Sequence, residues 1–260
     1  MNESTSKPAL HVESRGRKDR PALLLLHGLL SSNLQWELQR PAFDDAFRWH
    51  AAELWGHGGS PAPIDPPAYS ADGYVGAFEA LRRALGLERW IVVGQSLGAG
   101  LMLRYALDHP EAVRGIVLTN SLSAFSEVGS ALHSPTLEDV RALDLRTLPV
   151  HPTHAKRFPQ DLRDRMARAA DGVDRVALWR AFAETLRSTC CRDQLPKLAV
   201  PALLVNGARE RAFQPHRDFA AGAMPGLRVV DLEAGHAVNI EAPQEFEAAV
   251  LGFTASLADG

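Results

Sequence analysis

Cysteine is nearly absent from this sequence of 260 residues, and its two thiols, Cys190 and Cys191, are neighbours. Adjacent cysteines cannot link distant parts of a chain, so a framework of disulfide bonds is excluded and a reducing compartment is favoured. The segment 1–19 is polar and lacks the apolar stretch of a signal peptide, and the leucine run at 23–26 is too short to cross a bilayer. We therefore expect a cytoplasmic protein that does not act at a membrane.

The sequence also has no large excess of positive or negative charge. The 28 basic and 31 acidic residues leave a net charge of −3, and no basic cluster interleaved with aromatic residues is present, so nucleic acid is not expected as a partner. Gly94, Gly98 and Gly100 lack the spacing of a dinucleotide-binding loop. His151 and His154 have no cysteine or carboxylate at the spacing of a zinc site. We expect a small-molecule substrate, no cofactor and no metal; the sequence does not indicate an oligomeric state.

What the chain does contain is enough apolar sequence, 46% of its residues, for one large core. Strand-like and helical patterns alternate over residues 10–121 and again over 197–257, whereas residues 122–196 contain no convincing strand. Helical periodicity in that middle segment is found at 136–143, 160–170 and 174–186. These patterns predict an α/β core interrupted by a helical insertion.

A serine between glycines stands where an apolar run gives way to a helical pattern. Residues 90–93 (WIVV) are typical of a short buried strand, and residues 101–107 (LMLRYAL) of the helix that follows. A strand that turns into a helix through one residue strains that residue and needs neighbours without a Cβ two positions away, which Gly94 and Gly98 provide. Ser96 would then present its hydroxyl at the helix N-terminus, where backbone N–H groups favour negative charge. The pattern favours a nucleophile over an ordinary turn serine.

A serine hydroxyl needs a general base, and an acid that orients the base. Of the ten histidines, His236 is the candidate base, because it follows a glycine beyond a strand-like segment, 227–232, and precedes a helical pattern, 243–253. The apolar residues that mark the buried face of that helix are Phe246, Val250, Phe253 and Leu257. Together with Ser96, His236 indicates nucleophilic catalysis.

With these residues the chain resembles the α/β-hydrolase superfamily, through four signatures in the family's order. Residues 23–30 (LLLLHGLL) look like the buried strand and oxyanion turn, and residues 53–60 (ELWGHGGS) like the D-x-x-G-x-G-x-S loop, with Glu53 in place of aspartate. Residues 94–98 (GQSLG) match the nucleophile elbow, and 235–236 the histidine loop. The resemblance implies a mostly parallel, doubly wound sheet of the α/β-hydrolase type, with a helical cap inserted after strand 6.

The resemblance also implies a position for the acid, and there the sequence departs from the pattern. The family shows G-x-x-D after the penultimate strand, but this chain has Gly207-Ala208-Arg209-Glu210. Glutamate can replace aspartate in a triad, so Glu210 is the expected acid. Glu210 also lies between two arginines, and the alternative is that it is a solvated surface charge. Asp218 and Asp231 are weaker candidates, because one falls on a predicted helix and the other inside a strand, and residues 114–121 contain no acid.

By motif position, the oxyanion hole would consist of the backbone N–H groups of Leu29 and Leu97. Such donors contribute about 3–4 kcal/mol each in acyl-transfer sites. The resemblance gives His27 a structural role in bracing the oxyanion turn. The expected reaction needs no metal ion.

The expected domains are a core, residues 1–121 and 197–260, and a helical cap, residues 122–196. In the cap, Trp179 and Phe182 are candidate residues of an apolar substrate pocket, although their helical spacing equally suits the interior of the cap. Arginines of the cap, such as Arg157 and Arg180, are possible contacts for a substrate carboxylate, although most arginines of such helices are solvated.

Three classes of function remain open. The leading hypothesis is a serine hydrolase with a Ser-His-Glu triad that cleaves a carboxylic ester, thioester or lactone through an acyl-serine intermediate. A variant is hydrolysis of a C–C bond beside the ketone of a ring-cleavage acid, which relatives perform with the same triad. The third is a non-hydrolytic small-molecule receptor or regulator on the same fold, since a fold does not determine a function.

Overall fold

Seven strands form one sheet, in the order β1-β3-β2-β4-β5-β6-β7. The strand β1 is antiparallel to β3, and the remaining pairs are parallel. The strands are β1 (Val12–Gly16), β2 (Ala22–Leu26), β3 (Arg48–Ala52), β4 (Trp90–Gly94), β5 (Val113–Leu118), β6 (Ala202–Gly207) and β7 (Arg228–Leu232). This computed structural model describes residues 9–126 and 135–257. The positions 1–8, 127–134 and 258–260 of the expected core and cap therefore lie outside the described residues.

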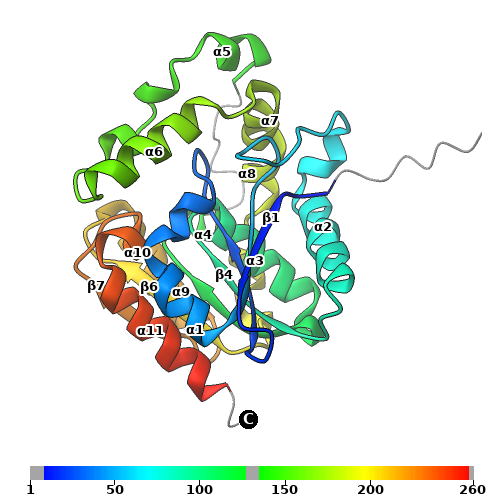
Figure 1. Cartoon of the computed structure of the whole chain (residues 1–260), viewed down its shortest axis with the longest axis vertical. Helices are drawn as coiled ribbons and strands as arrows, with labels where there is room; N and C mark the ends of the chain where they lie inside the picture. Colours follow the sequence, from blue (N-terminus) through cyan, green and yellow to red (C-terminus); the bar gives the residue numbers. More distant parts are fainter. Residues whose placement is uncertain (1–8, 127–134, 258–260) are drawn as a thin grey trace, which may run out of the picture.

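Helices cover both faces of the sheet and its upper edge (Figure 1). The α-helices are α1 (Arg40–Ala46), α2 (Ala71–Ala84), α3 (Leu97–Asp108), α4 (Leu122–Phe125), α5 (Leu137–Ala142), α6 (Gln160–Asp171), α7 (Arg175–Arg180), α8 (Leu186–Ser188), α9 (Gln214–Ala223), α10 (Val238–Glu241) and α11 (Pro243–Ser256). The 3₁₀ turns are η1 (Asn33–Gln39), η2 (Pro66–Tyr69), η3 (Pro110–Ala112), η4 (Leu145–Thr147), η5 (Pro152–His154), η7 (Arg192–Lys197) and η8 (Arg211–Phe213). One π-helical segment, η6 (Ala181–Thr185), joins α7 to α8.

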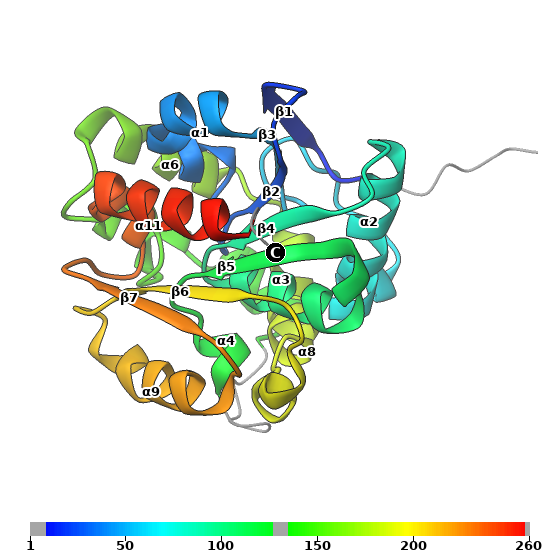
Figure 2. The same cartoon turned by 90° about the horizontal axis from the view of Figure 1, so that it is seen from below.

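Side chains alternate between the two faces of each strand, as the two-residue period of a strand requires. Leu24, Val92 and Ile116 pack on the side of α2, α3 and α9, whereas Leu23 and Val93 pack on the side of α1 and α11. Seen from below, the sheet lies between these two helical layers (Figure 2). The central strands are buried on both faces, which explains their continuous apolar runs.

The parallel strands end at one edge, and the register brings their ends into line. Leu26 pairs with Gly94, and Gly94 pairs with Leu118. The residues that follow β2, β4, β5, β6 and β7 therefore meet at this edge, where ligands bind in open α/β sheets. All the expected catalytic residues follow one of these strands.

The inserted segment, residues 122–196, contains helices and turns and no strand in its described part. It follows β5, which is the strand expected as the sixth of the family's sheet. Figure 1 shows α5, α6 and α7 together at the top of the molecule, beyond this edge of the sheet. Part of its apolar residues form a separate cluster that contains Leu30, from the loop that follows β2, whereas others, such as Phe125 and Ala177, belong to the main core.

The predicted fold class is confirmed, and so are most of its elements. The Thr136 side chain and Asp139 form the capping box that begins α5, and α11 buries Phe246, Val250 and Phe253 as predicted. The helix predicted over 174–186 is not regular, because residues 181–185 wind as a π-helix with more residues per turn. None of the helices in the described ranges is both long and apolar enough to cross a membrane.

Candidate active site

Ser96 occupies a strained turn between β4 and α3. Its backbone has φ 54° and ψ −118°, a conformation that costs energy for a residue with a Cβ. A Cβ on Gly94 would overlap the Gly98 carbonyl oxygen, and a Cβ on Gly98 would overlap the Leu26 carbonyl oxygen. Both glycines are therefore required by close packing, as the sequence predicts.

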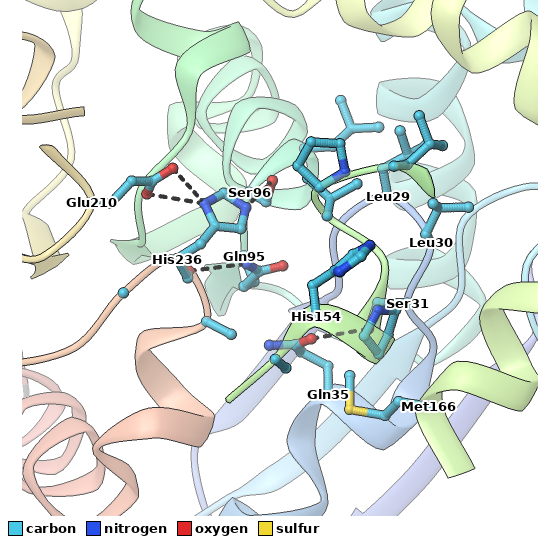
Figure 3. Close-up of a pocket in the computed structure, with 18 of the residues that line it drawn as sticks. Leu29, Leu30, Ser31, Gln35, Gln95, Ser96, His154, Met166, Glu210 and His236 are labelled. Carbon is cyan, nitrogen blue, oxygen red and sulfur yellow. Dashed lines mark hydrogen bonds and ion pairs between the residues drawn. The ribbon is translucent and has the colours of Figure 1, made fainter. Parts of the chain in front are cut away.

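His236 lies between Ser96 and Glu210 and bonds to both (Figure 3). The distance from His236 Nε2 to Ser96 Oγ is 2.9 Å, and His236 Nδ1 lies 2.9 Å from Glu210 Oε1 and 3.0 Å from Oε2. Since a carboxylate only accepts, Nδ1 carries the proton, and Nε2 is free to accept the hydroxyl hydrogen of Ser96. The structure thus brings together three residues that lie far apart in the sequence.

Asn120, which follows β5, holds the carboxylate of Glu210. Its Nδ2 donates to Glu210 Oε2 at 2.8 Å, and its Oδ1 accepts from the backbone of Gly207 at 2.9 Å. Burial alone would raise the pKa of Glu210, but the hydrogen bond and charge of His236 and the hydrogen bond from Asn120 together hold that pKa below its usual range. The sequence did not indicate this role for Asn120, because an asparagine after a strand has no motif of its own.

Two further contacts hold the loop that carries His236. Gln95 Nε2 donates to the His236 carbonyl oxygen at 3.3 Å, and Glu241 accepts from the Gly235 backbone at 2.9 Å. Gln95 belongs to the serine turn, so the nucleophile and the base are linked directly. Neither residue type carries a sequence signal for this role.

A buried amide network connects the same loop to the segment after β2. Gln35 Nε2 donates to Asn239 Oδ1 at 2.7 Å, and Asn239 Nδ2 donates to the Gln35 carbonyl oxygen at 2.7 Å and to Gln39 Oε1 at 3.0 Å. Ser31 donates to Gln35 Oε1 at 2.9 Å. Because buried amides are costly to leave unpaired, this network fixes the two loops relative to each other.

The expected oxyanion donors, Leu29 and Leu97, both line the cavity beside Ser96. Within the described residues, neither backbone N–H donates a hydrogen bond. The turn that contains Leu29 lies directly against the elbow, because a Cβ on Gly28 would overlap Oε1 of Gln95 and Cβ of Ser96. Two unpaired donors beside the Ser96 hydroxyl are suited to bind a developing oxyanion.

Leu30 shares the strain of Ser96: in the described residues, these two are the non-glycine residues with positive φ. The Leu30 N–H donates to His57 Nε2 at 3.3 Å, and His57 Nδ1 donates to the Trp55 carbonyl oxygen at 3.0 Å. Strained residues collect at functional sites when their surroundings hold them in place. His57 therefore braces the turn that carries Leu29 and Leu30, a role that the sequence did not indicate.

His27 is a second histidine that braces the same turn. Its Nε2 accepts from the Leu54 N–H at 3.2 Å, and its Nδ1 donates to the Gly28 carbonyl oxygen at 2.8 Å. Burial lowers the pKa of His27 to about 3 and that of His57 to about 4, so both rings are neutral near pH 7. Each needs its neutral form, because one ring nitrogen of each accepts a hydrogen bond.

A cavity of about 700 Å³ opens above Ser96. Phe182 lines this cavity and Trp179 does not. Trp179 instead packs in the cluster that contains Val140, Leu145 and Leu178, with the Arg180 guanidinium 4.3 Å from its ring centre. Trp179 thus packs, half-buried, against the apolar cluster of the inserted segment, which Phe182 also contacts from its place in the cavity wall. In Figure 3, Glu210 and Met166 lie on opposite sides of this cavity.

Across residues 9–126 and 135–257, no group of three or more histidine, cysteine or acidic side chains is placed to hold a metal. His151 is buried, and its Nε2 lies 3.4 Å from Asp171 Oδ1. His154 instead lines the cavity, and its Nε2 donates to the Arg146 carbonyl oxygen at 2.6 Å. The two histidines therefore have separate partners.

Known proteins resemble the chain along most of its length. A family model described as alpha/beta hydrolase fold matches residues 21–179. The chain is 28% identical to a 2-succinyl-6-hydroxy-2,4-cyclohexadiene-1-carboxylate synthase of Serratia proteamaculans, over 94% of the chain and 97% of that protein. It is 29% identical to a pimeloyl-[acyl-carrier protein] methyl ester esterase of Stenotrophomonas maltophilia, over 96% and 99%. A solved hydrolase structure from Pseudomonas aeruginosa matches with a TM-score of 0.83 at 27% identity, over 94% of each chain.

Proposed function

The chain belongs to the α/β-hydrolase fold family and is an enzyme, and we propose that it cleaves a carboxylic ester, thioester or lactone through an acyl-serine intermediate. The observation that carries this proposal is the position of His236, within hydrogen-bond distance of Ser96 on one side and Glu210 on the other. That geometry suits a nucleophile, a general base and an orienting acid.

The reaction would begin with proton transfer. His236 Nε2 takes the hydroxyl proton as Ser96 Oγ attacks the carbonyl carbon, and Glu210 stabilises the imidazolium that forms. The tetrahedral oxyanion accepts hydrogen bonds from the N–H groups of Leu29 and Leu97. His236 then protonates the leaving oxygen or sulfur, and the acyl group remains on Ser96. A water molecule, deprotonated by His236, releases the acid by the same steps.

The inserted segment would act as the cap over this chemistry. Its residues Phe158, Met166 and Phe182 contribute apolar walls to the cavity, while the catalytic groups follow strands of the core. The cap would choose the substrate and the core would transform it. We place the enzyme in the cytoplasm, acting on a small molecule, since its two adjacent cysteines are both free.

One named relative, a methyl ester esterase, supports hydrolysis of an ester. Another is named as a synthase, so a reaction other than ester hydrolysis is the alternative. A panel of p-nitrophenyl acyl esters, lactones and ring-cleavage ketone acids, assayed with the wild type and with Ser96→Ala, tests the proposal. We expect turnover of esters or lactones that Ser96→Ala abolishes. Turnover of the ketone acids alone would establish the C–C hydrolase, and no turnover of any compound in the panel would contradict the proposal.

A further inference from the structure

The rim of the cavity carries three cations and few free anions. Lys156 and Arg157 lie on the segment before α6, and Arg209 lies in the loop after β6; all three are exposed and line the cavity. Its acidic lining residues, Glu210 and Glu241, are already engaged, one by His236 and Asn120 and the other by the Gly235 N–H. The rim therefore has an excess of available positive charge.

The partners of the three cations leave that charge poorly compensated. Arg157 Nη1 donates to the Glu233 carbonyl oxygen at 3.1 Å, and Arg209 Nε donates to Glu233 Oε2 at 3.1 Å. The Glu233 side chain is 82% exposed, so its attraction is strongly screened by solvent. Within the described residues, Lys156 has neither a hydrogen bond nor an ion pair. Two guanidinium groups from different parts of the fold thus converge on Glu233, and Lys156, the neighbour of Arg157 in the sequence, lines the same cavity.

The cavity between this rim and Ser96 is largely apolar. Leu29, Leu97, Met166 and Phe182 are among its lining residues. A ligand that fits both regions has a reactive carbonyl, an apolar middle and a negatively charged end. The planar fork of arginine suits carboxylate and phosphate in particular.

We infer that the rim formed by Lys156, Arg157 and Arg209 binds an anionic group, a carboxylate or a phosphate, at the end of the substrate remote from the bond that is cleaved. This inference rests on the proposed ester hydrolysis and adds the substrate class. Because the three cations are exposed, they contribute to selection and capture of the substrate and not to the chemical step.

The test compares two esters of equal chain length, p-nitrophenyl hexanoate and the mono-p-nitrophenyl ester of adipic acid. The measured quantity is the ratio of their kcat/KM values, charged over neutral. In the variant Lys156→Gln/Arg157→Gln we expect this ratio to fall by about fivefold, as exposed charge pairs allow. Raising the salt concentration from about 0.01 M to about 0.5 M should lower the ratio in the wild type and change it less in the double variant.

Arg168→Gln is the matched control, since Arg168 is exposed on α6 and does not line the cavity. Its ratio should equal that of the wild type. Adipate and inorganic phosphate, each added as a competitor, distinguish a carboxylate from a phosphate, and the stronger competitor should lose its effect in the double variant.

An unchanged ratio in the double variant would overturn the inference, as would failure of both competitors. A lower melting temperature with the same ratio would mean that Arg157 only joins the inserted segment to Glu233. Failure of the proposed function would differ from either result, because the wild type would then cleave neither ester, or Ser96→Ala would cleave both.

Discussion

The amide of Asn120 donates to the Glu210 carboxylate at 2.8 Å, across a sequence separation of 90 residues. Asn120 follows β5 and Glu210 follows β6, two neighbouring strands of the sheet. Glutamate is one methylene longer than the aspartate of the family pattern, and this contact holds the longer side chain toward His236. Asn120 therefore orients the carboxylate of Glu210 toward His236.

Replacement of the acid should affect turnover and leave the fold intact. Glu210→Gln keeps the shape of the side chain but cannot stabilise an imidazolium, so we expect kcat to fall by about 10³–10⁴-fold. Glu210→Asp should retain part of the rate, limited by its shorter reach. Steady-state kinetics with a small ester, together with melting temperatures, measure both effects. Near-wild-type turnover by Glu210→Gln would mean that another residue is the acid.

Asn120→Ala should lower kcat by about 10- to 100-fold, since a typical hydrogen bond to a charged group contributes about 1.5–3 kcal/mol. If Asn120 acts through Glu210, the same substitution in the Glu210→Gln background should have little further effect on kcat. The four proteins of this double-mutant cycle separate positioning from general stability. Equal effects in both backgrounds would contradict the role assigned to Asn120.

Phe182 and Trp179 should respond differently to truncation. Phe182→Ala changes a wall of the cavity, so we expect altered relative kcat/KM among acyl chains, by about 1–3 kcal/mol per lost apolar contact. Trp179→Ala removes packing inside the inserted segment and should lower the melting temperature while the order of acyl preference is kept. A changed order in Trp179→Ala, with an unchanged melting temperature, would refute this assignment.

Acid should destabilise the fold through the buried histidines. The folded-state pKa is about 3 for His27 and about 4 for His57, below their usual value, so the unfolded chain binds more protons between those values and about pH 6.5. Stability therefore falls as the pH drops through this window, by up to about 1.4 kcal/mol per pH unit for each histidine. Urea unfolding at several pH values measures this slope. His57→Gln should show a shallower slope, and an equal slope would contradict a buried neutral His57.

The positions of Ser96 and His236 and the fold were predictable from the sequence, because each leaves a local pattern. The Gly94 and Gly98 spacing reflects close packing around a strained Ser96, and the alternating strand and helix patterns reflect buried faces. The resemblance then located Glu210 despite its substitution. The structure brings all three side chains into hydrogen-bond contact.

The supporting residues were not predictable, because their roles depend on contacts between distant segments. Asn120, Gln95 and His57 are ordinary polar residues in the sequence, and only their positions at the sheet edge give them partners. Trp179 and Phe182 had equivalent patterns, and helical periodicity does not show that Phe182 lines the cavity and Trp179 does not.

The most direct test of the proposed mechanism is the mass of the intact protein after brief incubation with a fluorophosphonate or a slowly released p-nitrophenyl ester. The account predicts one covalent adduct on the wild type, located at Ser96 by peptide mapping. Ser96→Ala should remain unmodified, and His236→Ala should react at a rate lower by about 10⁴–10⁶-fold. Full modification of Ser96→Ala, or an adduct on another residue of the wild type, would contradict the acyl-serine mechanism.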